Sequence, residues 1–255
     1  MVGFVGRIAA IAAFLALQAD LAGAAELKVF STIGVKGAVE QLAPEFEKAS
    51  GHKLAITWAT AAMLVKRVEA GEAADVLILT RAGIETLSKD GKIAPGSQAP
   101  LASSGIAVAV KAGAPKPDIS TPEALKQALL AAKSITYVDP ASGGASGVYF
   151  AKVLERLGIA EAMKAKTKFP APSDNPANLV VGGEAELAVE QKPEALDVAG
   201  TEVVGFLPGD LSQVTAFVAG VEADSKNAEA AAALIKLLQS PEAAAIFRVH
   251  GYDVN

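Results

Sequence analysis

The chain of 255 residues contains no cysteine, which excludes disulfide scaffolds, thiolate metal sites and cysteine nucleophiles. Its only histidines are His52 and His250, so a histidine-rich metal site is excluded as well. The 23 lysines and arginines are outnumbered by 28 aspartates and glutamates, which argues against nucleic acid as a partner. Because 51% of the residues are hydrophobic, the chain is not a disordered one. We therefore expect a folded protein without metal or other cofactor.

The first 24 residues differ in composition from the rest. Arg7 is the only basic residue before the apolar run 8–17, and Ala22-Gly23-Ala24 places small residues where a signal peptidase reads them. A membrane anchor is the alternative, but the run is too short to cross about 30 Å of hydrocarbon. No later segment has 18 uninterrupted apolar residues. We predict a signal peptide at 1–24 and a soluble, periplasmic mature protein.

The mature chain alternates apolar strands with amphipathic helices, a pattern typical of an α/β fold. The alternation of strands and helices is interrupted near residue 101, and a second series of alternating strands and helices begins near residue 134. We predict two α/β lobes, joined by extended strands near 101–110 and 210–220, with a hinge and an interlobe cleft. The boundaries we predict are 25–104 plus 216–255 for lobe 1 and 105–215 for lobe 2.

Ligands of open α/β sheets bind beyond the carboxyl ends of the strands. Hydroxyls, small residues and free backbone N–H groups at such ends favour an anion site. The alternatives are ordinary ones: helix caps, close helix packing or a flexible turn. The candidates that follow predicted strands are Ser31, Thr32 and Gly34, then Thr60 and Ala61, and then the loop residues Ser142, Gly143, Gly144, Ala145 and Ser146.

Two longer polar side chains also follow predicted strands. Arg81 comes directly after the apolar run 75–80, where a guanidinium would clamp a carboxylate with two hydrogen bonds. Gln191 follows the run 185–189 and would hydrogen-bond a ligand. Solvated surface side chains are the alternative for both. No set of nucleophile, base and acid stands out in the sequence.

Several segments carry a resemblance to a known family. These are Lys28-Val29-Phe30-Ser31, the run Val68 to Val76 with its E-A-G-x-x-A-D pattern, Asp139-Pro140 with Gly147-Val148-Tyr149, and the ending Ser240 to Phe247. The chain resembles the periplasmic molybdate-binding proteins of ABC importers over essentially its whole mature length. The resemblance implies a type II periplasmic binding protein that closes on a small anionic ligand and presents it to an inner-membrane permease. A monomer is expected.

The residues that hold molybdate in this family are not retained. The resemblance places Gly34 where molybdate binders have a serine, Thr60-Ala61-Ala62 where they have a serine cluster, and Gln191 where they have a tyrosine. Each lost hydroxyl removes a hydrogen bond worth about 1.5–3 kcal/mol to an anion. We therefore expect an organic di- or tricarboxylate, with Arg81 neutralising one carboxylate.

Two alternatives to this carboxylate receptor stay open. The sequence also resembles members of the superfamily that act as aconitate isomerases, which shift a proton and a double bond between trans- and cis-aconitate. That reaction needs an acid/base group, for which Glu190 and Tyr149 are the candidates. The other alternative is a molybdate or tungstate binder that uses mainly backbone N–H groups.

Overall fold

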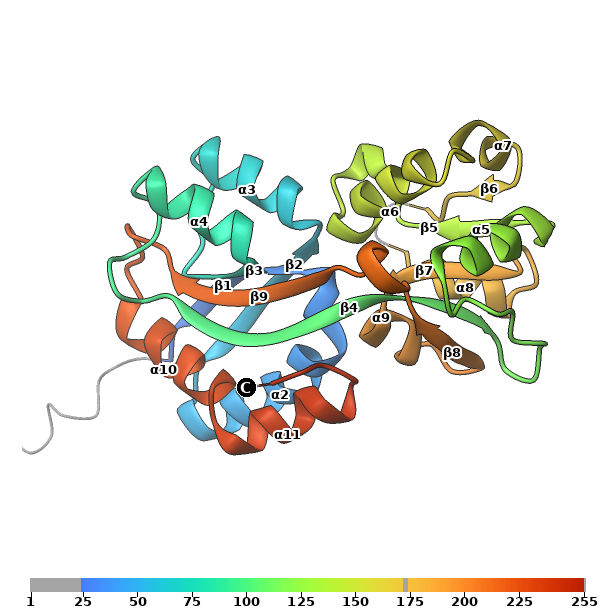
Figure 1. Ribbon diagram of the computed structural model, residues 1–255. Coiled ribbons are helices and arrows are strands. Elements are labelled where there is room, and N and C mark those ends of the chain that lie inside the picture. The colour runs from blue at the N-terminus through green and yellow to red at the C-terminus, as the bar shows by residue number, and fades with distance from the viewer. Residues whose placement is uncertain (1–23, 172–173, 255) are drawn as a thin grey trace, which may run out of the picture.

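The computed structural model describes residues 24–171 and 174–254. The predicted signal peptide, apart from Ala24, lies outside the described residues. The described chain folds into two α/β lobes, as predicted, with one sheet continuing through both (Figure 1).

The first lobe begins with three parallel strands. β1 (Glu26–Thr32) lies between β2 (Lys53–Ala59) and β3 (Val76–Thr80). The helix α2 (Lys36–Ser50) places four apolar side chains at helical spacing against this sheet and ends at Gly51, whose φ of 75° is the left-handed conformation that glycine adopts without strain. The predicted alternation of apolar strands and amphipathic helices is confirmed in this lobe. Helices α3 (Ala61–Glu69) and α4 (Arg81–Lys89) follow β2 and β3.

Two long antiparallel strands connect the lobes. β4 (Ala99–Lys111) pairs with β9 (Val214–Val221) in the first lobe, and it continues into the second lobe, where it pairs with β7 (Leu187–Gln191) and β8 (Thr201–Phe206). β9 also pairs with β3. Figure 1 shows both strands running from one lobe into the other, which places the connection where the sequence predicts it.

The second lobe is completed by short strands and helices. β5 (Ile135–Tyr137) lies parallel between β7 and β6 (Thr167–Lys168). The main helices are α5 (Pro122–Ala131) and α6 (Ala145–Arg156). Shorter elements that the sequence analysis did not predict are α7 (Ala160–Lys164), α8 (Pro176–Val181), α9 (Lys192–Leu196), β6 and β8. Single 3₁₀ turns occur at η1 (Ile33–Val35), η2 (Pro140–Ser142) and η3 (Gly209–Leu211).

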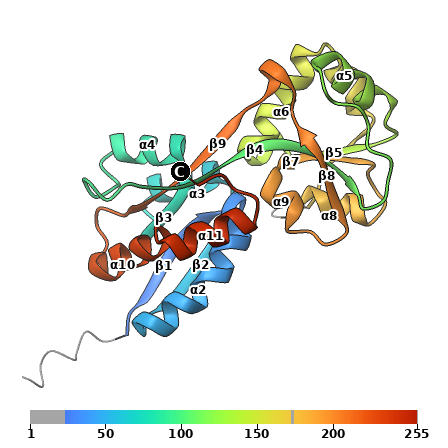
Figure 2. The same cartoon turned by 60° about the horizontal axis from the view of Figure 1, so that its bottom comes forward.

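The C-terminal helices return to the first lobe, as Figure 2 shows. α10 (Ala228–Leu238) and α11 (Pro241–Val249) pack against α2, and the Tyr252 hydroxyl donates a 2.6 Å hydrogen bond to the carbonyl of Gly34. No single helix within 24–171 and 174–254 is long and apolar enough to cross a bilayer, and α10 and α11 reach that length only as a pair with a 59° bend.

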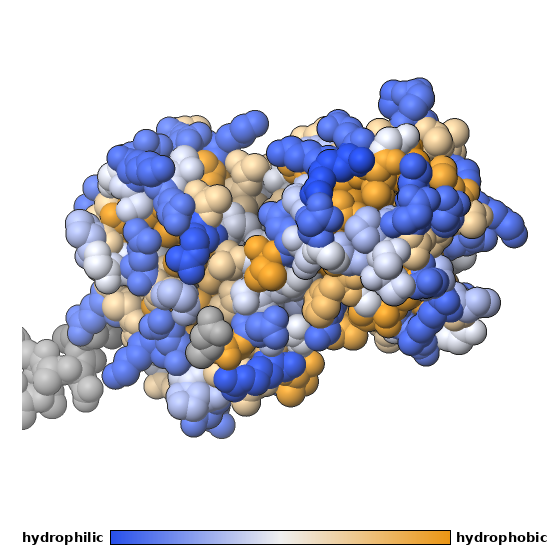
Figure 3. Space-filling model, in the orientation of Figure 1, coloured by the Kyte–Doolittle hydropathy of each residue, from blue (hydrophilic) through white to orange (hydrophobic). Residues whose placement is uncertain are grey.

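Separate apolar cores stabilise the two lobes. Two clusters draw their buried residues from 27–102 and 217–252, and two others draw theirs from 106–211. This division supports the predicted lobe boundaries, which stay a prediction at the level of individual residues. Figure 3 shows hydrophilic residues over much of the displayed face, with apolar residues gathered in smaller patches.

Candidate functional site

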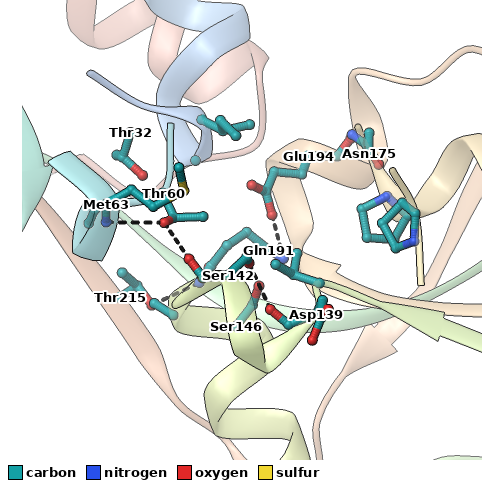
Figure 4. A pocket seen from close by; sticks show the side chains of 18 of the residues that line it. Thr32, Thr60, Met63, Asp139, Ser142, Ser146, Asn175, Gln191, Glu194 and Thr215 are labelled. Atoms are coloured by element: carbon teal, nitrogen blue, oxygen red, sulfur yellow. Dashed lines mark hydrogen bonds between the residues drawn. The ribbon is translucent and has the colours of Figure 1, made fainter. Parts of the chain in front are cut away.

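A cavity of about 210 Å³ lies between the lobes at the carboxyl ends of the parallel strands. Its lining comes from the segments after β1, β2, β3, β5, β6 and β7 and from the connecting strand β9. Most of these segments follow the carboxyl end of a parallel strand, where ligands of open α/β sheets bind. Thr32 and Thr60 belong to the first lobe, whereas Glu194 and Asn175 belong to the second (Figure 4).

Two threonines line the cavity because they cap helices. The Thr60 hydroxyl accepts a hydrogen bond from the N–H of Met63 at the start of α3, and Thr80 does the same for Gly83 at the start of α4, both at 3.3 Å. The same two threonines therefore cap helices and line the cavity. A helix start directs N–H groups and partial positive charge at a bound anion.

Thr60 also joins the lobes. Its hydroxyl donates a 2.7 Å hydrogen bond to the carbonyl of Ser142 in the second lobe (Figure 4). A Cβ added at Gly143 would lie 2.7 Å from the Cβ of Ala62, so the backbones approach closely at this point. The described conformation is therefore one in which the lobes are in contact across the cleft.

The glycine-rich loop between β5 and α6 forms a 3₁₀ turn with a side-chain hydrogen bond of its own. The Ser142 hydroxyl donates to the carbonyl of Asp139 at 2.7 Å, and Gly143 adopts a φ of 73°. A Cβ on Gly147 would lie 1.9 Å from the carbonyl oxygen of Val138. Glycine is therefore needed at this position because α6 packs closely against the end of the preceding segment. The loop places the start of α6, with Ser146, at the cavity.

Gln191 is buried at the end of β7, where the two lobes meet. Its side-chain amide donates a 2.8 Å hydrogen bond to the hydroxyl of Thr215 on β9. Its Oε1 atom has no hydrogen-bond partner in the described protein. Gln191 therefore presents an unused acceptor at the cavity, which it lines together with other predicted site residues.

Glu194 is the acidic residue of greatest chemical interest in the cavity, and the sequence analysis did not identify it. The Glu194 carboxylate accepts the backbone N–H of Gln191 at 3.2 Å, which turns the side chain back toward the cleft. Burial raises the pKa of Glu194 to about 7, Asp197 adds to the increase, and the Gln191 N–H opposes it. Such a carboxyl both accepts and donates a proton near neutral pH.

Asn175 fixes the helix that carries this glutamate. Its side-chain amide donates a 2.7 Å hydrogen bond to the backbone carbonyl of Glu194, and its oxygen accepts the N–H of Ala177. Two sequence signals were available for this region. Asn175-Pro176 is a typical helix start, and Gln191 with a glutamate three residues later is a capping-box spacing.

Most of the predicted site residues line the cavity. Those that do are Thr32, Gly34, Thr60, Ala61, Ser142, Gly144, Ala145, Ser146 and Gln191. Three predicted ligand-binding residues do not. Ser31 is buried and directs its hydroxyl to the carbonyl of Thr32, Gly143 lies beside the lining, and Arg81 lies outside it.

The placement of Arg81 corrects the predicted role of that residue. Thr80 ends β3 and faces the cavity, but Arg81 is the first residue of α4 and is exposed. Adjacency to Thr80 in the sequence therefore did not place the arginine in the cavity lining. The prediction that Arg81 neutralises a carboxylate within the cavity is therefore wrong.

The two predicted candidate bases also lie outside the cavity lining. Glu190 precedes Gln191 on β7 and points to the opposite face of the sheet, where it is fully buried. The Tyr149 hydroxyl donates to the carbonyl of Leu211 at 3.2 Å. Neither side chain is placed to take a proton from a ligand, and we transfer the candidate role to Glu194.

The charge of the cavity is unusual for an anion site. Three carboxyl groups line it, those of Asp139, Asp174 and Glu194. Among its described lining residues there is no lysine, arginine or histidine. The polar groups that remain for a ligand are neutral hydroxyl and amide groups and helix N-termini.

The fold and this interlobe cavity define a two-lobed solute-binding protein. Comparison with protein families agrees, because the model of the bacterial extracellular solute-binding proteins matches residues 27–253. The chain belongs to the bacterial extracellular solute-binding protein family.

Individual relatives fall into two groups by name. The chain is 36% identical over 224 residues to an aconitate isomerase from a Pseudomonas species, covering 86% of this chain and 84% of that protein. It is 26% identical over 239 residues to the molybdate-binding protein ModA of Escherichia coli K12, covering 92% and 91%.

Solved structures match the same fold. The periplasmic molybdate-binding protein of Azotobacter vinelandii has a TM-score of 0.74 at 21% identity, covering 90% of this chain and 99% of that one. The sulfate-binding protein SubI of Mycobacterium tuberculosis has a TM-score of 0.72 at 18% identity, covering 91% and 88%.

Proposed function

We propose that the protein binds a small organic polycarboxylate in the interlobe cavity and isomerises aconitate there, with Glu194 moving the proton. The observation that carries this proposal is the carboxyl of Glu194, which lines the cavity and has a pKa of about 7. The 36% identity to an aconitate isomerase supports the same reaction. Isomerisation of aconitate needs a proton-transferring group but no nucleophilic residue.

The lining residues provide neutral partners for several carboxylates. In the first lobe these are the hydroxyls of Thr32 and Thr60, and in the second the hydroxyl of Ser146 and the start of α6. A ligand with several carboxylates can contact hydroxyl groups of both lobes at once, because the lobes are in contact around the cavity. The walls between these groups are apolar, with Ile33, Met63 and Phe217 among them.

The reaction is an allylic proton shift. The ionised Glu194 carboxylate takes one proton from the CH₂ group of aconitate, and the electron pair of that C–H bond is delocalised over the allylic carbons and the adjoining carboxylate. The proton returns to the other end of the allylic system, and the double bond moves by one position. Atoms and electrons balance without an oxidant, a reductant or a cofactor.

Gly34 gives a structural reason why the site is not built for molybdate. A side chain at this position would place its Cβ 2.9 Å from the ring of Phe217. The serine that the family resemblance places here in molybdate binders therefore requires the ring to move.

The test is incubation of the purified protein with trans-aconitate, followed by proton nuclear magnetic resonance. We expect cis-aconitate to accumulate over many turnovers. The variant Glu194→Gln is expected to lose turnover at least 100-fold while still folding, because the glutamine side-chain oxygen also accepts the N–H of Gln191. The matched control is Glu155→Gln on the outer part of α6, which is expected to turn over at the rate of the unaltered protein.

A receptor without catalysis is the second candidate, favoured by the fold shared with transport proteins. In that case the protein, exported by its signal peptide and monomeric in the periplasm, delivers the ligand to an ABC permease. Calorimetric binding of aconitate without turnover would support the receptor and refute the isomerase. Tight binding of molybdate with no binding of aconitate would contradict both.

A further inference from the structure

The short helix α9, which carries Glu194, packs against both lobes. It contributes Ala195 to an apolar core of the second lobe, and it also contacts η1 in the first lobe. A helix of five residues is too short to be stable by itself, so its position depends on the contacts at its two sides. The position of the Glu194 carboxyl therefore depends on what holds α9 to the first lobe.

Two glycines of the first lobe leave room for the end of α9. A Cβ added at Gly251 would lie 2.5 Å from the side chain of Leu196, and a Cβ added at Gly37 would collide with the carboxylate of Asp197. Gly251 also has a φ of 89°, which glycine adopts without strain. The end of α9 therefore packs directly against the backbone of the first lobe.

A histidine of the first lobe contacts the residue that ends α9. The Oδ1 atom of Asp197 lies 2.6 Å from Nδ1 of His250, which follows α11. The other ring nitrogen, Nε2, lies 2.9 Å from Oε1 of Gln41 on α2. The side chains of Asp197 and His250 are 30% and 18% exposed, so water competes only partly with their contact. The imidazole is thus held between α2 and the end of α9.

The segment that carries His250 also reaches the cavity. The hydroxyl of Tyr252 donates a 2.6 Å hydrogen bond to the carbonyl of Gly34, which lines the cavity. On the side of the second lobe, the amide of Asn175 holds the backbone carbonyl of Glu194. Without the contact at His250, the end of α9 keeps only packing contacts with the first lobe.

We propose that His250 is a positioning residue for the proposed reaction: through Asp197 it holds α9 against the first lobe and so fixes the Glu194 carboxyl at the cavity. The part played by Glu194 rests on the proposed function, but the attachment of α9 does not depend on turnover. Neither His250 nor Asp197 lines the cavity, so both act through α9 and not on the ligand. Proton transfer is sensitive to such an attachment, because a displacement of about 1 Å costs about a hundredfold in rate.

The first experiment measures initial rates with trans-aconitate. We expect His250→Ala to lower kcat about tenfold and to leave KM within about twofold, because the hydroxyls proposed to contact the carboxylates lie on other elements. His250→Asn is expected to restore most of kcat, since its amide nitrogen takes the place of Nδ1 beside Asp197. The matched control is His52→Ala, at the other histidine, directly before β2, and it should change neither constant. An unchanged kcat in His250→Ala would overturn the inference.

A double-mutant cycle tests whether His250 and Asp197 act as a unit. Asp197→Ala is also expected to lower kcat, and the variant with both substitutions should lose no more than the larger of the two single losses. Losses that multiply in the double variant would overturn the inference, because they would show that His250 acts independently of Asp197.

Hydrogen exchange measured by mass spectrometry follows α9 without any turnover. We expect the amides of α9 to exchange about fivefold faster in His250→Ala, the effect of losing one hydrogen bond, while those of α5 are unchanged. Unchanged exchange in α9 would overturn the inference whether or not the protein is an enzyme. Faster exchange of α9 in a protein that does not isomerise aconitate would support the attachment and refute the proposed function.

Discussion

Replacement of Glu194 by glutamine should change how the stability of the protein depends on pH, even without a ligand. The cause is the raised pKa of this carboxyl in the folded protein, about 7 against 4.5 for an ordinary glutamate. The folded state therefore holds a proton that the unfolded state releases between these two values. Below pH 4.5 the contribution to stability is complete, and it is lost as the pH rises through 7.

The magnitude follows from the same two values. A difference of about 2.5 pH units corresponds to about 3 kcal/mol at about 1.4 kcal/mol for each unit. Solvent screening reduces this effect, because Glu194 is partly exposed, so we expect about 2 kcal/mol. The free energy of unfolding of the unaltered protein should fall by that amount, relative to Glu194→Gln, between pH 5 and pH 8.

Urea unfolding followed by circular dichroism at several pH values measures this difference. The m-value should be the same in both proteins, so that the two free energies are comparable. Parallel curves for the two proteins from pH 5 to pH 8 would refute the reasoning, because they would show that Glu194 has an ordinary pKa in the folded state.

Three further predictions concern other parts of the molecule. Asp75→Ala removes a carboxylate that accepts hydrogen bonds from the N–H of Lys28 and the hydroxyl of Ser225, and should lower the free energy of unfolding by about 3 kcal/mol; a change below 1 kcal/mol in urea unfolding would contradict this. Thr60→Val removes the bond between the lobes, worth about 1 kcal/mol, and should weaken polycarboxylate binding about fivefold in calorimetry, whereas Thr60→Ser should not. Arg81→Ala should leave the dissociation constant within about twofold; a tenfold increase would return this residue to the site.

The elements with strong local signals could be predicted from the sequence. The sequence of the last part of the chain has helix-forming patterns at 228–238 and 241–249, and α10 and α11 span the same residues. The strands that end at the cavity were also identified, and with them Thr32, Thr60 and the loop that carries Ser146. These predictions succeeded because apolar periodicity and helix stops are local properties.

The acid at the cavity could not be found in this way. Glu194 lies on α9, a five-residue helix with too few turns to show a periodic pattern. Its position in the cleft depends on contacts between α9 and the first lobe, which are distant in sequence. Arg81 was wrongly predicted to line the cavity. It follows a strand end in the sequence, but its place in or outside the site depends on the orientation of α4, which it begins.

The strand β4 belongs to both lobes at once. Its first part contributes Leu101 and Ala102 to one core, and its later part contributes Ile106, Val108 and Val110 to another. Neither half of the molecule can therefore melt without taking away a strand on which its neighbour depends. The two lobes are separate in shape but form a single cooperative unit, and movement between them must come from bending and twisting of the shared ribbon.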